Sequence, residues 1–238
     1  MIEFKNLDNA ELVLRHSLFV RSTALTLDYC AEHGGIGLTT SKGFKRTFVD
    51  WAARAFDWPG YTSEDLYAVN KVLNEMDLPP LGFIREALLA LKIGRHYKGE
   101  FKLTCSGKEL VGNPAQLFGI IAPFYLFEFD HWAYSRRPTA PMGNWDIFLN
   151  VINVEADTAI TGVELVEKIF GIKQKEKGLF GNPESASFFS GVLQPLCWIG
   201  FLEEIKVANN YFADRLYVKT PLWKEALRLD TDHYIHEN

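Results

Sequence analysis

The sequence predicts a mainly helical α+β protein with short β-hairpins, built from two similar units in tandem. Three observations support this fold class. Apolar residues recur at helical spacing along most of the chain, glycine or asparagine turns separate short strand-like segments, and one pattern of apolar spacing occurs twice. The chain has 238 residues, of which 47% are hydrophobic, so it can form two domains with real cores.

The clearest unit lies at residues 78–111, where we expect a helix, a hairpin and the start of another helix. Two prolines open the segment, and apolar residues then recur at offsets typical of one helical face. The segments 95–97 and 101–103 are expected strands. A tight turn at Lys98-Gly99 joins them, because glycine supplies the positive φ that many hairpins need.

The elements that should precede this unit lie upstream. We expect helices at 22–33, at 41–56 with Ser41 as N-cap, and at 64–76, with a short strand at 36–39 after the first helix. The resulting order of helix, strand, helix, helix and hairpin predicts a winged-helix-like domain.

The second half of the chain repeats this pattern. Residues 24–39 align without a gap to 146–161, and residues 83–95 align to 191–203, with apolar residues at matching positions. We therefore predict two tandem winged-helix-like domains. The expected division is an N-terminal arm packed on the first domain (1–112), an aromatic-rich helical connector (113–143), and the second domain with a polar, frayed tail (144–238).

Residues 117–132 of the connector are densely apolar and aromatic. Soluble monomers rarely expose such a patch, so it must be covered. Two interpretations stay open. The segment is either a helix buried between the two domains, or a surface that holds a protein partner or a second copy of the chain.

The sequence contains no catalytic or metal-binding motif, so we expect a non-catalytic protein without a cofactor or metal ion. It lacks phosphate-binding loops, a nucleophile elbow and a zinc-protease helix. His233 and His236 lie close together, but a terminal tail holds metal poorly. Three widely spaced cysteines fit a reducing cytoplasm, and the apolar runs are too short for a membrane helix. The expected location is cytoplasmic.

Basic residues gather in the first domain although the chain has a formal net charge of −5. Residues 36–54 contain four basic and one acidic residue, residues 82–112 six and three, and residues 189–227 four of each. A basic helix and a basic hairpin are what contact with phosphates requires. We therefore predict a regulatory protein that binds nucleic acid, expected to be double-stranded DNA, through Lys42, Lys45, Arg46, Arg95, Lys98 and Lys102.

One observation argues against this prediction and keeps an alternative open. The helix at 82–93 offers few polar side chains, whereas base readout in the major groove uses several. The basic residues would then be only a solvated surface. The alternative function is a protein–protein interaction module that does not bind nucleic acid and pairs with a partner or with itself through 117–132.

Two short motifs resemble a winged-helix-like module of uncharacterised bacterial proteins, in particular the plasmid ORF-3-like group. They are Gly34-Gly35-Ile36-Gly37-Leu38-Thr39 and Leu103-Thr104-Cys105-Ser106-Gly107-Lys108-Glu109-Leu110. The resemblance covers the first half of the chain, because the second unit lacks the Gly-Lys element. It implies a fold and brings no catalytic residues.

Overall fold

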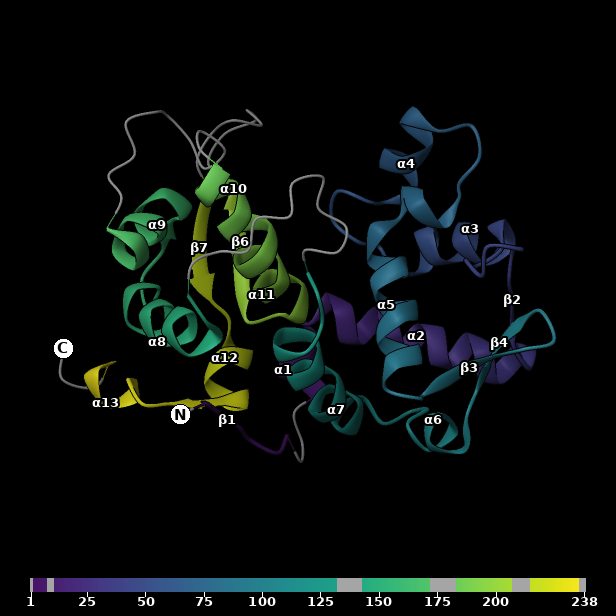
Figure 1. Cartoon of the computed structure of the whole chain (residues 1–238), viewed down its shortest axis with the longest axis horizontal. Helices are drawn as coiled ribbons and strands as arrows, with labels where there is room; N and C mark the ends of the chain where they lie inside the picture. Colours follow the sequence, from purple (N-terminus) through teal and green to yellow (C-terminus); the bar gives the residue numbers. More distant parts are fainter. Residues whose placement is uncertain (1, 8–10, 132–142, 172–182, 207–214, 236–238) are drawn as a thin grey trace. The chain divides into compact units, whose positions relative to one another are not determined.

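The computed structural model describes residues 2–7, 11–131, 143–171, 183–206 and 215–235 (Figure 1). It confirms the α+β class, since the elements are mainly helices accompanied by small antiparallel sheets. The chain divides into two compact units. We call Leu18–Ile121 the N-terminal unit and Met1–Ser17 with Ala122–Asn238 the C-terminal unit. Among the described residues, no helix is both long and apolar enough to cross a bilayer.

The N-terminal unit combines a group of helices with a three-stranded sheet of order β2-β4-β3. Its elements are α2 (Leu18–His33), β2 (Ile36–Gly37), α3 (Arg46–Ala55), α4 (Ser63–Val69), the 3-10 helix η1 (Glu75–Asp77), α5 (Pro79–Ala90), β3 (Gly94–Tyr97), β4 (Glu100–Leu103) and α6 (Cys105–Glu109). Helix α7 (Pro114–Phe127) follows.

An aromatic core lies beneath this sheet. The ring of Phe44 contacts those of Phe48 and Phe101, with centroids 4.9 and 5.5 Å apart, and all three side chains are buried. Gly94 passes directly over the ring of Phe101, where a Cβ atom would come within 1.9 Å of it. The hairpin therefore requires glycine at this position.

The C-terminal unit has a second three-stranded sheet, of order β5-β7-β6, and a separate pair of strands. Its elements are β1 (Ile2–Phe4), α1 (Glu11–Leu14), α8 (Trp145–Glu155), β5 (Ile160–Thr161), α9 (Gly162–Phe170), α10 (Pro183–Phe188), the π-helical turn η2 (Phe189–Leu193), α11 (Gln194–Ile199), β6 (Leu202–Lys206), β7 (Arg215–Lys219), α12 (Pro221–Ala226), β8 (Leu227–Leu229) and α13 (Asp232–Ile235).

The predicted repeat is confirmed in the order of elements and in its hydrogen bonds. In each unit the last strand of the sheet is its central strand, and a threonine follows it. The backbone N–H of Thr104 donates to the carbonyl of Ile93, and that of Thr220 donates to Phe201, both at 3.0 Å. Both threonines also cap the next helix. Ile93 and Phe201 are positions that the sequence alignment pairs.

Two expected helix boundaries were wrong. Helix α3 begins at Arg46 and not after Ser41, because the preceding residues form a turn in which Lys42 adopts φ +68°. The helix expected at 64–76 ends at Val69, and the chain becomes helical again only in η1. In both places turn geometry decides the boundary, while apolar spacing alone suggested a longer helix.

The two ends of the chain also differ from expectation. The first strand belongs to the C-terminal unit, because β1 pairs with β8 and places Ile2 opposite Leu229. The backbone N–H of Lys5 extends this pairing by donating to Ala226, at 2.8 Å. The tail, which we expected to fray, forms α13.

Candidate functional site

Three of the predicted site residues lie where α3 begins. Lys45 is the N-cap residue, and its backbone N–H donates to the carbonyl of Gly37 at 2.9 Å while its side chain passes over that glycine. Arg46 donates from Nε to Oδ1 of Asn74 at 3.1 Å. Lys42 and Lys45 are exposed and form no ion pair within the described part of the chain.

The other three residues lie on the hairpin of β3 and β4. The guanidinium of Arg95 is 5.4 Å from the centroid of the Tyr97 ring, and the ammonium of Lys98 is 5.3 Å from it. Tyr97 is 45% exposed, so the ring and both cations are available at the surface. Lys102 forms an ion pair with Glu100 at 3.0 Å.

Hydrogen bonding brings these two groups to the same end of the sheet. The backbone N–H of Leu38 donates to the carbonyl of Gly99 at the hairpin tip, at 2.9 Å. The pKa of His96 on β3 is lowered by partial burial and then by the positive charges of Arg85 and Lys42, so Lys42 acts on the hairpin electrostatically. Of the six predicted residues, four are exposed and have neither an ion pair nor a side-chain hydrogen bond among the described residues, and we call them the basic surface: Lys42, Lys45, Arg95 and Lys98.

The free positive charge is smaller than the sequence count suggested. Arg85 pairs with Glu75 at 2.8 Å, and Arg54 pairs with Asp50 at 2.9 Å. Lys102, a predicted phosphate contact, is paired with Glu100, whereas Arg46, another, has one donor engaged by Asn74 but keeps its charge because that amide is neutral. An exposed ion pair contributes little to stability, but it neutralises part of the field that would attract an anion.

The polar side chains of α5 are few and already engaged. Arg85 lies 3.8 Å from Glu86 and also holds Glu75, while the other side chains of this helix are apolar. Base readout needs donors and acceptors along an exposed helical face. The arrangement therefore favours contact with phosphates over contact with bases.

The hairpin of the C-terminal unit is paired internally. Arg215 on β7 donates to both carboxylate oxygens of Glu204 on β6, at 2.8 and 2.9 Å. Lys219 at the end of β7 pairs with Asp157 at 3.2 Å. These cations bind side chains of their own unit and are less available to a ligand. Residues 207–214, between the two strands, lie outside the described residues.

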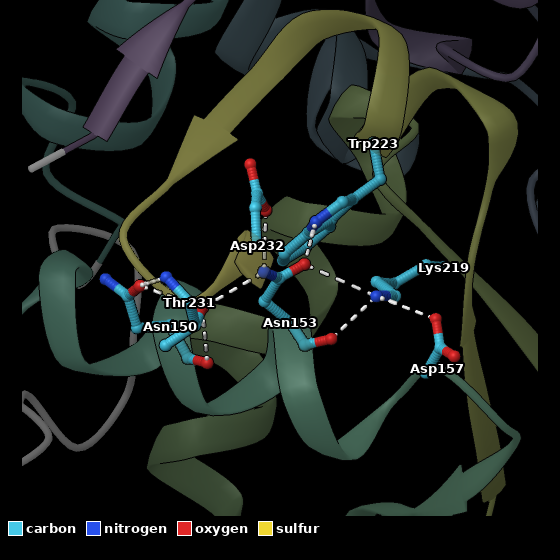
Figure 2. Close-up of polar contacts among 7 residues, drawn as sticks. All are labelled: Asn150, Asn153, Asp157, Lys219, Trp223, Thr231 and Asp232. Carbon is cyan, nitrogen blue, oxygen red and sulfur yellow. Dashed lines mark hydrogen bonds and ion pairs between the residues drawn. The ribbon is translucent and has the colours of Figure 1, made fainter. Parts of the chain in front are cut away.

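A polar network that the sequence analysis missed surrounds Asn153 on α8 (Figure 2). Asn153 is only 1% exposed. Its Nδ2 donates to Thr231 and Asp232 at 3.0 and 2.9 Å, while its Oδ1 accepts from the indole Nε1 of Trp223 at 2.9 Å. Lys219 donates to its backbone carbonyl at 2.6 Å. We call this set the Asn153 network.

The Asn153 network joins α8, β7, α12 and the end of the chain. Thr231 also donates from Oγ1 to Asn150 at 2.9 Å, and Asp232 accepts from the backbone N–H of Leu229 at 3.0 Å. A buried amide is stable only when its donors and acceptors are satisfied. The sequence signal was the pair of asparagines three residues apart in a helix whose interior residues are otherwise apolar.

The aromatic segment 117–132 is largely covered. Leu117, Phe118, Ile121 and Tyr125 are buried, whereas Phe127 is 40% exposed. Residue 132 lies outside the described residues. Among the residues that are described, no three histidine, cysteine, aspartate or glutamate side chains gather as metal ligands, and His236 is not among them.

Comparison with known sequences places the chain in a family. The Y4jL N-terminal domain matches residues 15–116, and the y4jL C-terminal domain matches residues 135–221. "Uncharacterized protein y4jL" of Sinorhizobium fredii (strain NBRC 101917 / NGR234) is 38% identical over 169 residues, which are 71% of this chain and 76% of that protein. The chain belongs to the y4jL family. No solved structure matches it.

The y4jL match confirms part of the resemblance found in the sequence and corrects the rest. The relative is an uncharacterised bacterial protein, as expected. The family, however, covers both halves of the chain and not the first half alone. Its two domains correspond to the two units that carry the repeated order of elements.

Proposed function

We propose that this y4jL-family protein is a non-catalytic regulator that binds double-stranded DNA through the basic surface of its N-terminal unit. One observation carries the proposal. Four exposed cations lie at one end of one small sheet, and none has an acidic partner within the described residues. Lysine and arginine side chains of this kind bind the phosphates of duplex DNA and release its counterions.

The fold supports the same proposal. The order α2, β2, α3, α5, β3 and β4, with α4 and η1 between α3 and α5 and with sheet order β2-β4-β3, is compatible with a winged-helix domain, in which the β3–β4 hairpin would be the wing. The basic surface then consists of this wing and the turn that precedes α3. At the wing tip, Tyr97 lies between Arg95 and Lys98 and offers an aromatic face beside two phosphate-binding groups.

The number of free cations sets the expected salt dependence. Each phosphate neutralised on duplex DNA contributes about −0.9 to the slope of log K against log salt concentration, so four contacts predict a slope of about −3.6. The engaged side chains of α5 predict weak sequence preference. Binding should therefore be of the non-specific kind, with Kd on the order of 10⁻⁶ to 10⁻⁴ M at physiological salt.

Fluorescence anisotropy of a mixed-sequence duplex, titrated at two salt concentrations, tests the proposal. The double variant Lys42→Gln/Lys98→Gln should bind about tenfold more weakly or worse at low salt and reduce the slope by about 2. The matched control Lys168→Gln/Lys206→Gln removes two exposed lysines of the C-terminal unit and should keep the parent slope. Equal losses in both variants, or no binding of the parent at low salt, would refute the proposal.

A second candidate function, protein–protein interaction, is supported by apolar side chains at the surface between α4 and η1. Val69 is 81% exposed, Val72 48% and Met76 90%. Contiguous exposed apolar patches often mark a contact surface, and these three side chains lie within residues 69–76. If this surface binds a second copy of the chain, light scattering should detect a dimer that Val69→Ser/Met76→Ser abolishes. A monomer that still binds DNA would leave only the first proposal.

A further inference from the structure

A cavity of about 570 Å³ opens in the C-terminal unit beside the Asn153 network. Its volume lies in the range of small-molecule sites, about 300–1,000 Å³. Lys5 contributes to the wall from the segment after β1, and Asn153, Lys219, Trp223 and Lys224 contribute from α8, β7 and α12. We propose that this cavity binds a small organic anion, namely a phosphate or carboxylate group attached to an apolar portion.

The charges of the lining favour an anion. Lysines outnumber aspartates by three to two, and the aspartates are already engaged. Asp157 pairs with Lys219 at 3.2 Å. Asp232 accepts hydrogen bonds on both carboxylate oxygens, from Asn153 and from the backbone of Leu229. Because these donors are neutral, Asp232 keeps its charge, and the lining as a whole carries one net positive charge, from three lysines and two aspartates.

Lys5 and Lys224 form the anion-binding part of the cavity. The ammonium of Lys5 donates to the backbone carbonyl of Lys224 at 2.7 Å, and the backbone N–H of Lys5 donates to the carbonyl of Ala226 at 2.8 Å. Hydrogen bonds therefore fix both the backbone and the side chain of Lys5. An ammonium has three donor protons, and two on Lys5 remain. Lys224 is exposed and has no acidic partner in the described part of the chain.

Part of the remaining wall is apolar. The indole Nε1 of Trp223 is committed to Asn153, so this side chain offers only its ring (Figure 2). Pro221 and Leu227 extend the apolar wall. A ligand with an apolar portion can therefore contact this wall. Inorganic phosphate has no apolar portion and gains nothing from it.

The site is assembled by tertiary structure and is independent of the basic surface in the N-terminal unit. Lys5 and Lys224 are 219 residues apart in sequence, and the pairing of β1 with β8 brings them together. The proposal therefore adds a ligand site to the proposed DNA binding. Failure of either leaves the other intact.

Nuclear magnetic resonance of the full chain tests the site through the indole N–H of Trp223, which is assigned by its loss in Trp223→Phe. Titration with phenyl phosphate should shift this signal saturably, whereas inorganic phosphate should bind at least about tenfold more weakly and benzylamine should not bind. The double variant Lys5→Gln/Lys224→Gln should weaken phenyl phosphate about tenfold or more.

The control variant Lys168→Gln/Lys206→Gln changes the net charge of the same unit equally and should bind phenyl phosphate like the parent. Unchanged peaks elsewhere in each spectrum establish that the variant is folded. The proposal is overturned if benzylamine shifts the signal equally, if both double variants lose the same affinity, or if neither phenyl phosphate nor benzoate shifts the signal.

Discussion

The two units share an order of elements but use their charged side chains differently. In the N-terminal unit, Arg95 and Lys98 on the hairpin have no acidic partner among the residues that the structure describes. In the C-terminal unit, Arg215 on the corresponding hairpin binds both oxygens of Glu204. A repeated backbone therefore does not dictate a repeated surface, and the unpaired hairpin is the better candidate for binding an external anion.

The two units also differ in the side chains that they bury at equivalent positions. Leu103 and Lys219 occupy equivalent positions, each just before the capping threonine. Leu103 is a buried apolar side chain, whereas Lys219 donates into the Asn153 network and pairs with Asp157. A partly buried ammonium costs free energy unless acceptors surround it, so Lys219 and Asn153 depend on each other.

The largest expected difference between the units concerns the turn before each hairpin. Gly200 has φ +93°, and a Cβ there would lie 2.6 Å from backbone atoms of His16, so Gly200→Ala should lower the free energy of unfolding by about 3 kcal/mol or more. Lys92, at the equivalent position, already carries a side chain at φ +57°. Lys92→Ala should change the free energy of unfolding, measured by urea denaturation, by less than about 0.5 kcal/mol. Similar losses in the two variants would contradict the comparison.

The second-largest expected difference between the units concerns the Asn153 network. Asn153→Ala leaves the indole of Trp223 without its acceptor and removes one of the acceptors of Lys219, so we expect a loss of about 3 kcal/mol. Residue 31 aligns with 153, and Ala31 is exposed. Ala31→Asn should therefore change stability by less than about 0.5 kcal/mol.

Hydrogen exchange can localise the effect of Asn153→Ala. Amides of β8 and α13 should lose protection in this variant and keep it in Ala31→Asn. Full protection of α13 in Asn153→Ala would mean that the network does not hold the C-terminal residues.

Acid should weaken the C-terminal unit through His131. Burial lowers the pKa of this histidine to about 4, and its Nε2 donates to the carbonyl of Tyr125 at 2.6 Å. Between the folded pKa and an unfolded pKa of about 6.5, the unfolded chain binds more protons, so stability is fully present above that range and falls as pH decreases through it. We expect about 2 kcal/mol less stability at pH 5 than at pH 7.5.

His131→Gln should flatten this pH dependence, measured by urea denaturation at both pH values. The pKa of His96 in the N-terminal unit is also lowered, but its side chain is exposed. His96→Gln should therefore preserve most of the slope. If His96→Gln removed the slope and His131→Gln did not, the acid sensitivity would belong to the other unit.

The smallest expected effect compares the two hairpin arginines. Arg215 and Glu204 are mostly buried, with side chains 16% and 21% exposed, so Arg215→Gln should lower stability by about 1 kcal/mol. Arg95→Gln should leave stability within about 0.5 kcal/mol of the parent and weaken DNA binding. If Arg215→Gln weakened DNA binding and Arg95→Gln lowered stability, both expectations would be contradicted.

Helices and strands were predicted well where apolar spacing and turn residues alone set their position. The strands expected at 95–97 and 101–103 lie within β3 and β4, and the helix expected at 22–33 lies within α2. The start of α3 was predicted four residues too early, because Ser41 is a common N-cap residue but lies in a turn. Periodicity does not resolve such a turn, since its backbone is fixed by pairing with a neighbouring segment.

Long-range features were not predictable from the same patterns. Strand β1 is three residues long, too short to show alternation, and its partner β8 lies near the other end of the chain. The Asn153 network and the cavity lie beside this pairing of β1 with β8. No local rule connects Lys5 with Lys224, so the sequence offered no sign of the proposed anion site.

By itself, the sequence determined the order of elements, the repeat and the excess of basic residues in the first unit. It did so because helices, strands and caps follow from contacts between residues close in the chain. The tertiary structure alone decided which cations stay unpaired, as Lys42 and Lys98 do, and which bind a neighbour, as Lys102 and Arg215 do. The physical reason is that a charge is free or neutralised according to what lies within a few ångströms of it, which depends on how distant segments pack.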